Sequence, residues 1–271
     1  MANVSGMREA WVPEDIDVTT ASVARMYDYF LGGGHNLEVD RAAARQAIAI
    51  MPPIVDTARA NRAFLRRAVR ACMDAGIRQF LDLGSGIPTV GHVHDIAHRV
   101  DRAARVAYVD TDPIAVAHTE LLLAGLPTTT ITCADMTDPA AVLSAPGVRD
   151  LLDLDQPIAV VAAAVLHFVP DDRDPRGILQ TYRKITAAGS MLVFSHGAAI
   201  TDQPDRGRAI SELYRRTSHP GQSRCEAEIL ALLGDWRLLS PGLVDAHAWR
   251  PDHPNGTAPE QVRMWAALAA A

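Results

Sequence analysis

Short apolar runs alternate with longer amphipathic segments along most of the chain. Between residues 79 and 194 each run has the length of a buried strand, and the segments between them repeat apolar positions at helical spacing. The expected strands are residues 79–83, 105–109, 129–133, 158–165, 191–194 and 236–239, and the expected helices are 90–99, 113–123, 140–152 and 176–187. Gly189 is the expected C-cap of the last helix. The pattern predicts an α/β fold with a doubly wound, mostly parallel sheet, in which the very apolar strand 158–165 is central.

The first part of the chain shows only helical patterns. After a frayed leader, helical fragments are interrupted by three glycines at 32–34 and two prolines at 52–53. Residues 64–73 repeat apolar positions at helical spacing, and Gly76 is the expected residue just beyond that helix. We therefore expect a helical N-terminal cap over residues 1–75, of which the frayed leader is 1–14.

The region after the fifth strand departs from the alternation. Residues 200–221 form an insertion with helical content at 210–216. Ser223 and Glu226 form a capping-box pattern ahead of a helix that ends at Gly234. These features predict a second helical element beside the core.

The end of the chain leaves one element open. Residues 260–271 are rich in alanine and suit either a helix or a last strand. With no internal repeat and no low-complexity linker, we expect one domain over residues 1–271. Its core is residues 76–271 and carries the insertion.

Composition and charge narrow the range of partners. Hydrophobic residues make up 48% of the 271 residues and charged residues 21%, and the formal net charge is −6, which fits a folded globular protein. Lys184 is the one lysine beside many arginines, which reflects GC-rich codon usage. Because no basic run is long enough to follow a phosphate backbone, we expect no nucleic-acid partner.

Cysteine usage and hydropathy indicate the compartment. The cysteines are few and far apart, which fits a reducing cytosol rather than a disulfide scaffold or a cysteine zinc site: Cys72, Cys133 and Cys225. The longest apolar run, residues 158–166, is too short to cross ~30 Å of hydrocarbon. Residues 1–13 lack the pattern of a signal peptide. We therefore expect a cytoplasmic protein with no membrane partner.

Three histidines have a spacing that metal ligands also use. His94 and His98 share one helix face, and His92 lies nearby. No glutamate follows His94 as it does in metal hydrolases, so a solvated helix face is favoured. We expect no metal.

The clearest chemical signal stands at the end of the first strand. This strand carries Asp82 and runs into the turn Gly84-Ser85-Gly86. Glycines let a backbone pass close to a ligand, and the crevice of such a sheet lies beside this strand end. The alternative is a plain tight turn.

Carboxylates also follow the next two strands. Asp110 ends the second strand 24 residues after Gly86, near the expected ~20, where a carboxylate can accept both hydroxyls of a ribose. Its neighbour Thr111 is a further candidate to contact the cofactor. After the third strand, Asp135 can accept a hydrogen bond from an adenine amino group, and Met136 can cover the ring. The alternative at both positions is helix capping, which Asp112 can supply for the second helix.

The fourth strand ends in small residues that are followed by a histidine. Ala163 and Ala164 would let a cofactor lie against the sheet, and His167 stands at the rim of the same crevice. A histidine there can act as base, acid or hydrogen-bond partner near neutral pH. The alternative is a purely structural histidine.

Together these residues resemble a known family. The ordered set is similar to that of class I S-adenosylmethionine-dependent methyltransferases: Asp82, Gly84, Gly86, Asp110, Asp135 and Leu-His-Phe-Val-Pro at 166–170. The more specific stretches at 22–33 and 59–65 extend the likeness from about residue 16 to the end. With them the chain resembles a family of high-GC bacterial proteins, formerly a domain of unknown function and now labelled S-adenosyl methyltransferase.

The resemblance implies a fold, a cofactor and a reaction. The expected fold is a Rossmann-like sheet of seven strands, although residues 264–271 lack the glycine usual in the last strand. The expected cofactor is S-adenosylmethionine, and the expected reaction is methyl transfer to a small-molecule acceptor, such as one of secondary metabolism. The resemblance leaves the acceptor atom and the oligomeric state open.

The resemblance also assigns roles around the cofactor. Asp110 would hold the ribose, and Asp135 and Met136 the adenine. The glycine turn would pass under the methionine portion, and Asp82 would orient that turn or the amino group. The turn at 86–89 has Pro88 in place of a third glycine and is similar to that of leucine carboxyl methyltransferase relatives. By that likeness Arg59 or Arg62 would hold the cofactor carboxylate.

The acceptor should enter beneath the cap and the insertion. The candidates to contact it are Tyr27, Tyr29, His35, His167 and His196. A hydroxyl or ammonium acceptor needs one of them to take a proton, whereas positioning suffices for a neutral amine or an electron-rich carbon.

Two other functions remain open at this point. A protein with this fold can bind S-adenosylmethionine without catalysis, as a sensor or assembly partner. A nicotinamide-dependent reductase also uses spaced glycines, but Pro88 and Thr89 occupy the region of its third glycine.

Overall fold

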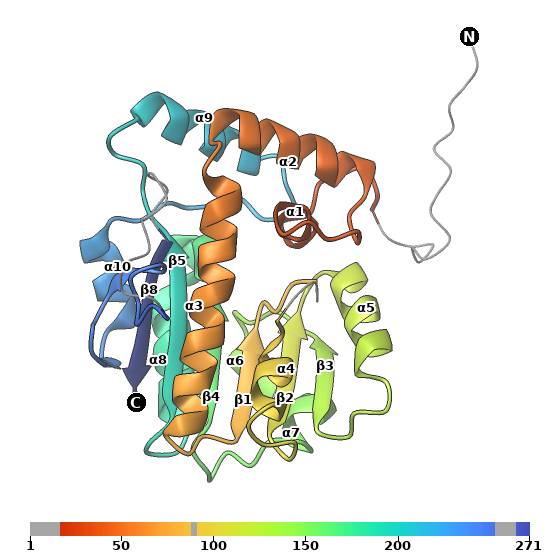
Figure 1. Ribbon diagram of the computed structural model, residues 1–271, viewed down its shortest axis with the longest axis vertical. Coiled ribbons are helices and arrows are strands. Elements are labelled where there is room, and N and C mark those ends of the chain that lie inside the picture. Colours follow the sequence, from red (N-terminus) through yellow and green to blue (C-terminus); the bar gives the residue numbers. More distant parts are fainter. Residues whose placement is uncertain (1–16, 88–90, 253–263) are drawn as a thin grey trace.

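The computed structural model describes residues 17–87, 91–252 and 264–271, and its centre is a mixed sheet of eight strands (Figure 1). The strands are β1 (Gln79–Leu83), β2 (Arg105–Asp110), β3 (Thr129–Cys133), β4 (Ala159–Ala163), β5 (Met191–Gly197), β6 (Arg237–Leu238), β7 (Val244–Asp245) and β8 (Met264–Ala270). Their order is β3-β2-β1-β4-β5-β8-β6, with β7 paired to β8. The first five strands are parallel, and β8 is antiparallel to β5, β6 and β7. The doubly wound, mostly parallel sheet is confirmed.

The strand order places a crevice between β1 and β4. The chain builds the sheet outward from β1 through β2 to β3, and then returns to add β4 and β5 on the other side of β1. The connections after β1 and β4 therefore leave in opposite directions, which opens a crevice at the carboxyl ends of these strands.

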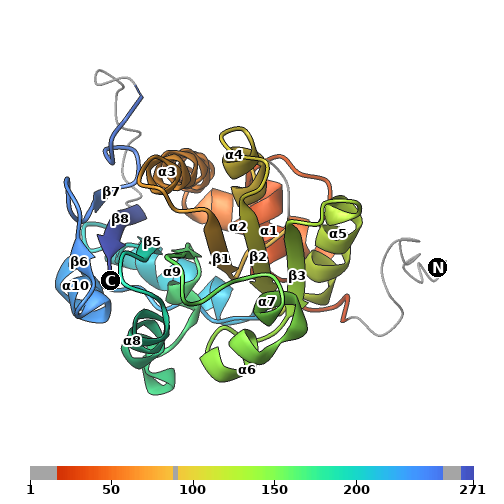
Figure 2. The same ribbon diagram turned by 90° about the horizontal axis from the view of Figure 1, so that it is seen from below.

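Helices cover both faces of the sheet (Figure 2). One face carries α3 (Ile54–Asp74), α4 (Val93–His98) and α5 (Pro113–Leu123), and the other carries α6 (Pro139–Ser144), α7 (Pro146–Arg149), α8 (Pro175–Ile185) and α10 (Glu226–Leu233). Alternate side chains of β1 supply both cores: Phe80 packs with α3, whereas Leu81 and Leu83 pack on the side of α8.

A helical cap lies over the carboxyl ends of the parallel strands (Figure 1). It consists of α1 (Val23–Phe30), α2 (Glu38–Ile50) and α9 (Pro204–Tyr214). The first two belong to the N-terminal region, and the insertion contributes α9. These helices share an apolar cluster with the start of α3, including Met26, Phe30, Met51, Ile54 and Ile210. Because the rest of α3 lies in the core, this helix belongs to both layers.

Buried ion pairs join the cap to the core. Arg25 donates through Nε to Asp40 at 2.6 Å and through Nη1 to Asp112 at 3.2 Å, and both of its pairs are almost completely buried. Asp112 also caps α5 by accepting from the amides of Ile114 and Ala115. Removing one partner of such a buried pair costs about 3–5 kcal/mol, because the other charge stays buried and uncompensated.

Most predicted elements are confirmed, but two helix expectations are wrong. Residues 140–152 form α6 and α7 rather than one helix, because Pro146 forces Ala145 into an extended conformation with ψ 133°. Gly189 is not the C-cap of α8. That helix ends at Ile185 with Thr186 as its cap, and Gly189 has φ +88° in the turn before β5.

The helix after the insertion begins differently from the prediction, and the tail adopts one of the two structures left open for it. The capping box of α10 uses Cys225 and Glu228 instead of Ser223 and Glu226, and Glu228 Oε2 accepts from the Cys225 amide at 2.6 Å. The tail forms the strand β8.

Some expectations fall outside the described residues: the leader at 1–14, the start of the helix expected at 90–99, and residues 260–263 of the tail. In the parts that are described, no helix has the length and apolar character needed to cross a bilayer.

Candidate functional site

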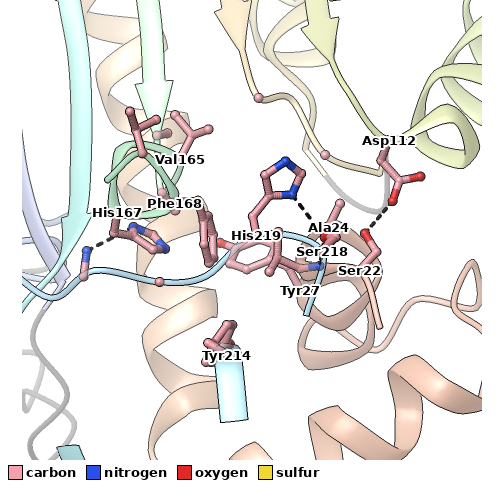
Figure 3. A pocket seen from close by; sticks show the side chains of 18 of the residues that line it. Ser22, Ala24, Tyr27, Asp112, Val165, His167, Phe168, Tyr214, Ser218 and His219 are labelled. Carbon is pink, nitrogen blue, oxygen red and sulfur yellow. Dashed lines mark hydrogen bonds between the residues drawn. The ribbon is translucent and has the colours of Figure 1, made fainter. Parts of the chain in front are cut away.

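A cavity of about 880 Å³ lies between the carboxyl ends of β1 to β4 and the helical cap (Figure 3). The core contributes most of the residues predicted to bind a cofactor: Asp82, Gly84, Ser85, Gly86, Asp110, Thr111, Asp135, Met136 and Ala164. The cap and the insertion contribute apolar side chains, including Phe30, Leu31, Met51, Ile54, Ile200 and Ile210, together with polar ones such as Ser22, Arg25 and Ser211.

The glycine turn forms part of the cavity floor. Gly84 and Gly86 have φ +65° and +66°, which favour glycine. A Cβ on Gly84 would stand 2.2 Å from Val165 Cγ2, so the turn also passes too close to the end of β4 for a side chain. Ser85 Oγ is buried and has no hydrogen-bond partner among the described residues. The turn therefore presents a bare backbone and one unsatisfied hydroxyl.

Asp110 organises this turn. Its Oδ2 accepts from the Gly86 amide at 2.6 Å and its Oδ1 from the Asp112 amide at 2.8 Å, and burial raises its pKa. Asp112, not Asp110, is the N-cap of α5. The capping alternative is thus taken up by the neighbouring residue. With the Thr111 amide as a third donor, the Asp110 carboxylate keeps one of its four lone-pair sites for a ligand.

A second buried carboxyl and an arginine lie beside the turn. Burial raises the pKa of Asp82 to about 7, although the positive charge of Arg62 works in the opposite direction. Arg62 lines the cavity and also donates to the Gly91 carbonyl at 2.8 Å. Arg59 is exposed, pairs with Asp56 and does not line the cavity. Of the two predicted arginines, the structure brings only Arg62 to the site.

The end of β3 forms another part of the floor. Asp135 accepts from the Thr137 amide at 2.8 Å and pairs with Arg173 at 3.1 Å. Met136 is buried, and its carbonyl accepts from the Tyr182 hydroxyl at 3.0 Å. Asp135 and its partner Arg173 thus both line the cavity, and the ion pair orients the Asp135 carboxylate.

A chain of hydrogen bonds crosses from the sheet to the cap. The Ala164 amide donates to Ser195 Oγ at 2.9 Å, which donates to Asn61 Oδ1 at 2.6 Å. Asn61 Nδ2 donates to the Tyr27 hydroxyl at 3.0 Å, which donates to the Ala58 carbonyl at 3.1 Å. Tyr27 lines the cavity as predicted, but both functions of its hydroxyl are used within the protein and burial raises its pKa.

The two predicted histidines at the end of the sheet have different positions. His167 lines the cavity, and its Nδ1 faces the Gly197 amide at 3.4 Å (Figure 3). Burial, together with nearby His196 and Arg224, holds the pKa of His167 well below its usual value. His167 is therefore neutral at physiological pH.

His196, which was predicted to contact an acceptor, does not line the cavity. His196 is buried outside the lining, where its Nε2 accepts from Arg224 at 2.9 Å and its Nδ1 donates to the Gly197 carbonyl at 2.7 Å. Burial lowers its pKa to about 4. His196 thus links Arg224 to the end of β5 through its two ring nitrogens.

Two further candidates also lie away from the cavity. Tyr29 packs against the apolar cluster of the cap, and the His35 ring lies 4.0 Å from that of His118. Neither residue belongs to the lining, so the structure does not bring either of them to the cavity.

The histidines of α4 have structural partners. His94 Nδ1 hydrogen-bonds the Tyr108 hydroxyl at 2.7 Å, and His98 Nε2 bonds the Ala104 carbonyl at 2.9 Å. Over the described ranges, no group of three or more His, Cys, Asp or Glu residues has the arrangement of a metal site.

Sequence reasoning did not single out Asn61, Ser195 or Tyr214 as site residues. A signal existed for Asn61, which is a polar residue on the apolar face of α3, and for Ser195, which follows Val193 on the face of β5 that packs against α3. Tyr214 lines the cavity from the end of α9 and gave no signal.

Comparisons with known proteins place the chain among methyltransferases. A family model described as S-adenosyl methyltransferase matches residues 9–271. A DUF574 family protein from Streptomyces avermitilis MA-4680 is 37% identical, with TM-score 0.88 over 94% of this chain and 98% of that one. A "putative methyltransferase" from Thermobifida fusca YX is 35% identical, with TM-score 0.88 over 96% of this chain and 98% of that one. None of the curated proteins compared with the chain matches it.

Proposed function

This chain belongs to the S-adenosyl methyltransferase family, and from that membership we propose that it transfers a methyl group to a small-molecule acceptor. Its fold is the Rossmann-like fold of class I methyltransferases. The cofactor is S-adenosylmethionine, which supplies a methyl group activated on a sulfonium centre. The observation that carries the proposal is the cavity, which lies between a polar floor at the strand ends and a helical cap that adds both apolar and polar side chains.

The polar groups of the floor fit this cofactor. The unsatisfied Ser85 hydroxyl and the bare turn suit a ligand laid across them. Asp110 would hold the ribose hydroxyls with Thr111 beside it. Arg62 would hold the carboxylate of the methionine portion.

The remaining contacts follow the same logic. Asp82 would face the ammonium group, because a cation there favours the ionised carboxyl over the neutral one. Asp135 and Met136 would hold the adenine, and Ala164 leaves room for the ligand at the end of β4.

The residues of this chain would catalyse by alignment and exclusion of water rather than by strong acid or base chemistry. His167 is neutral, and the cationic Arg224 behind it opposes its protonation. We propose that His167 positions the acceptor by a hydrogen bond. Tyr27 would shape the wall as a protonated phenol.

The closed cap supports a small acceptor of the kind that secondary metabolism produces. The helical cap and the core would act as one domain, because the cavity takes residues from both. The three free cysteines support a location in the cytoplasm. We propose no nucleic-acid or membrane partner.

Calorimetry tests the cofactor site. We expect binding of S-adenosylmethionine and S-adenosylhomocysteine, and no thermal stabilisation by NADH or NADPH. Asp110→Ala should abolish cofactor binding in a folded protein. The control is Asp138→Ala, an exposed helix cap outside the cavity lining, which should bind normally. Unchanged affinity in Asp110→Ala rejects the ribose assignment, and binding without turnover on any acceptor favours a non-catalytic role.

A further inference from the structure

One wall of the cavity is poor in charged side chains, and its histidines are His167 and His219. Behind the cofactor floor, the segment from Gly197 to Ser223 contributes lining residues that include no arginine, lysine or carboxylate. The neighbouring stretch at 165–170 adds His167, which is neutral. The charged lining residues lie on the floor, in and beside the cap helices, and at 172–173, which directly follow that stretch: Asp17, Arg25, Arg62, Asp82, Asp110, Asp112, Asp135, Asp172 and Arg173.

This wall is also rich in rings. Phe168 and Tyr214 have ring centroids 6.0 Å apart and tilted by 35°, and the His167 ring lies 4.2 Å from that of Phe168. Figure 3 shows Phe168, Tyr214, Tyr27 and His219 grouped around the same space. Ring faces and edges pack well against a flat apolar molecule.

The Tyr214 hydroxyl stands out within this wall. No described residue hydrogen-bonds to it, and burial alone raises the pKa of the phenol. Tyr214 is half-buried and its side chain lines the cavity, so a ligand with an acceptor atom can take the hydrogen bond of this hydroxyl in place of water. Tyr214 is thus a donor that the protein itself leaves unused.

From these observations we propose that the methyl acceptor is an uncharged, flat ring compound with a polar substituent, to which Tyr214 donates a hydrogen bond. The proposal rests on the function proposed above and names its substrate class. A charged acceptor would leave water for a wall that offers no counter-ion, and that transfer is unfavourable. Tyr214 is then a specificity-determining residue.

Three naphthalene probes of equal ring size separate charge from shape: neutral 2-naphthol, anionic 2-naphthoate and cationic 2-(aminomethyl)naphthalene. Their binding is measured by calorimetry on protein saturated with S-adenosylhomocysteine. We expect 2-naphthol to bind at least about tenfold more tightly than either charged probe. Equal or tighter binding of a charged probe overturns the proposal.

Variants then test the residue. Tyr214→Phe should weaken 2-naphthol about three- to tenfold, the range for one hydrogen bond, without changing the affinity for S-adenosylhomocysteine. Tyr29→Phe is the matched control, because Tyr29 is a cap tyrosine outside the lining and its loss should change neither affinity. Ser211→Lys places a cation in the wall and should strengthen 2-naphthoate. An unchanged 2-naphthol affinity in Tyr214→Phe overturns the assignment.

The two proposals fail in different ways. If S-adenosylhomocysteine binds and 2-naphthol does not, the acceptor class is wrong while the cofactor site stands. If S-adenosylhomocysteine does not bind, the proposed function itself is wrong.

Discussion

Replacing Asn61 with leucine removes the centre of the hydrogen-bond chain between sheet and cap. Asn61 is 2% exposed and Ser195 is completely buried. Leucine has a similar size but neither accepts from Ser195 Oγ nor donates to the Tyr27 hydroxyl, two bonds of 2.6 and 3.0 Å in the native protein. The variant therefore leaves two buried hydroxyls with one unmet hydrogen bond each.

The cost follows from these two groups. A buried polar group that loses its partner costs about 1–3 kcal/mol, and the extra apolar surface of leucine offsets a part. We expect a net loss of about 2–4 kcal/mol in the free energy of unfolding, given those values. At ~2–4 °C per kcal/mol for a domain of this size, the melting temperature falls by roughly 4–16 °C. Differential scanning calorimetry measures both quantities.

Removing the stranded hydroxyls as well tests the reasoning. In the triple variant Asn61→Leu, Ser195→Ala, Tyr27→Phe, both hydroxyls that Asn61 bonds in the native protein are removed. The Ala164 amide keeps a second acceptor, the Ser195 carbonyl at 3.0 Å. Because replacing both partners of a buried hydrogen bond is nearly neutral, the triple variant should be more stable than Asn61→Leu alone. A triple variant that is less stable than the single one refutes this account.

Three more outcomes follow from the site. Because burial raises the pKa of Asp82 from 3.8 to about 7, the folded protein holds this proton more tightly than the unfolded chain, so the free energy of unfolding should fall as pH rises from about 4 through 7. Urea unfolding at several pH values should show that Asp82→Asn loses this pH dependence. The same pH dependence in Asp82→Asn as in the native protein contradicts the assignment. His167→Ala should reduce turnover, measured as S-adenosylhomocysteine release, more than cofactor affinity, whereas equal losses make His167 structural. Gly84→Ala should lower both the melting temperature and cofactor affinity, because its Cβ meets Val165 at 2.2 Å and a positive φ costs alanine ~1–2 kcal/mol; wild-type values would show that the turn can relax.

The sequence predicted the elements well where local pattern decides them. The strand 79–83 and the helix 113–123 have the predicted bounds, since alternation, Pro113 and the Asp112 cap are all local signals. The tail could not be assigned, because its alanines suit helix and strand equally. Its pairing with three other strands makes it β8, and such partners are distant in sequence.

The site was predictable where a residue follows a strand directly. Asp82, Asp110 and Asp135 reach one cavity because parallel strands end at one edge of the sheet. The choice between Arg59 and Arg62 depends on the rotation of α3, which its tertiary contacts set. His196 was misplaced even though alternation along β5 offered a hint: Ser195 faces α3, so its neighbour points to the other side.

The length of α3 restricts how ligands reach the interior. Its 21 residues form one uninterrupted helix that begins in the cap and ends in the core. A helix that packs in both layers cannot move with the cap alone, so α3 fixes its side of the cap to the core. Access to the cavity is then expected on the opposite side, beside α9 and the residues up to Ser223, which line it.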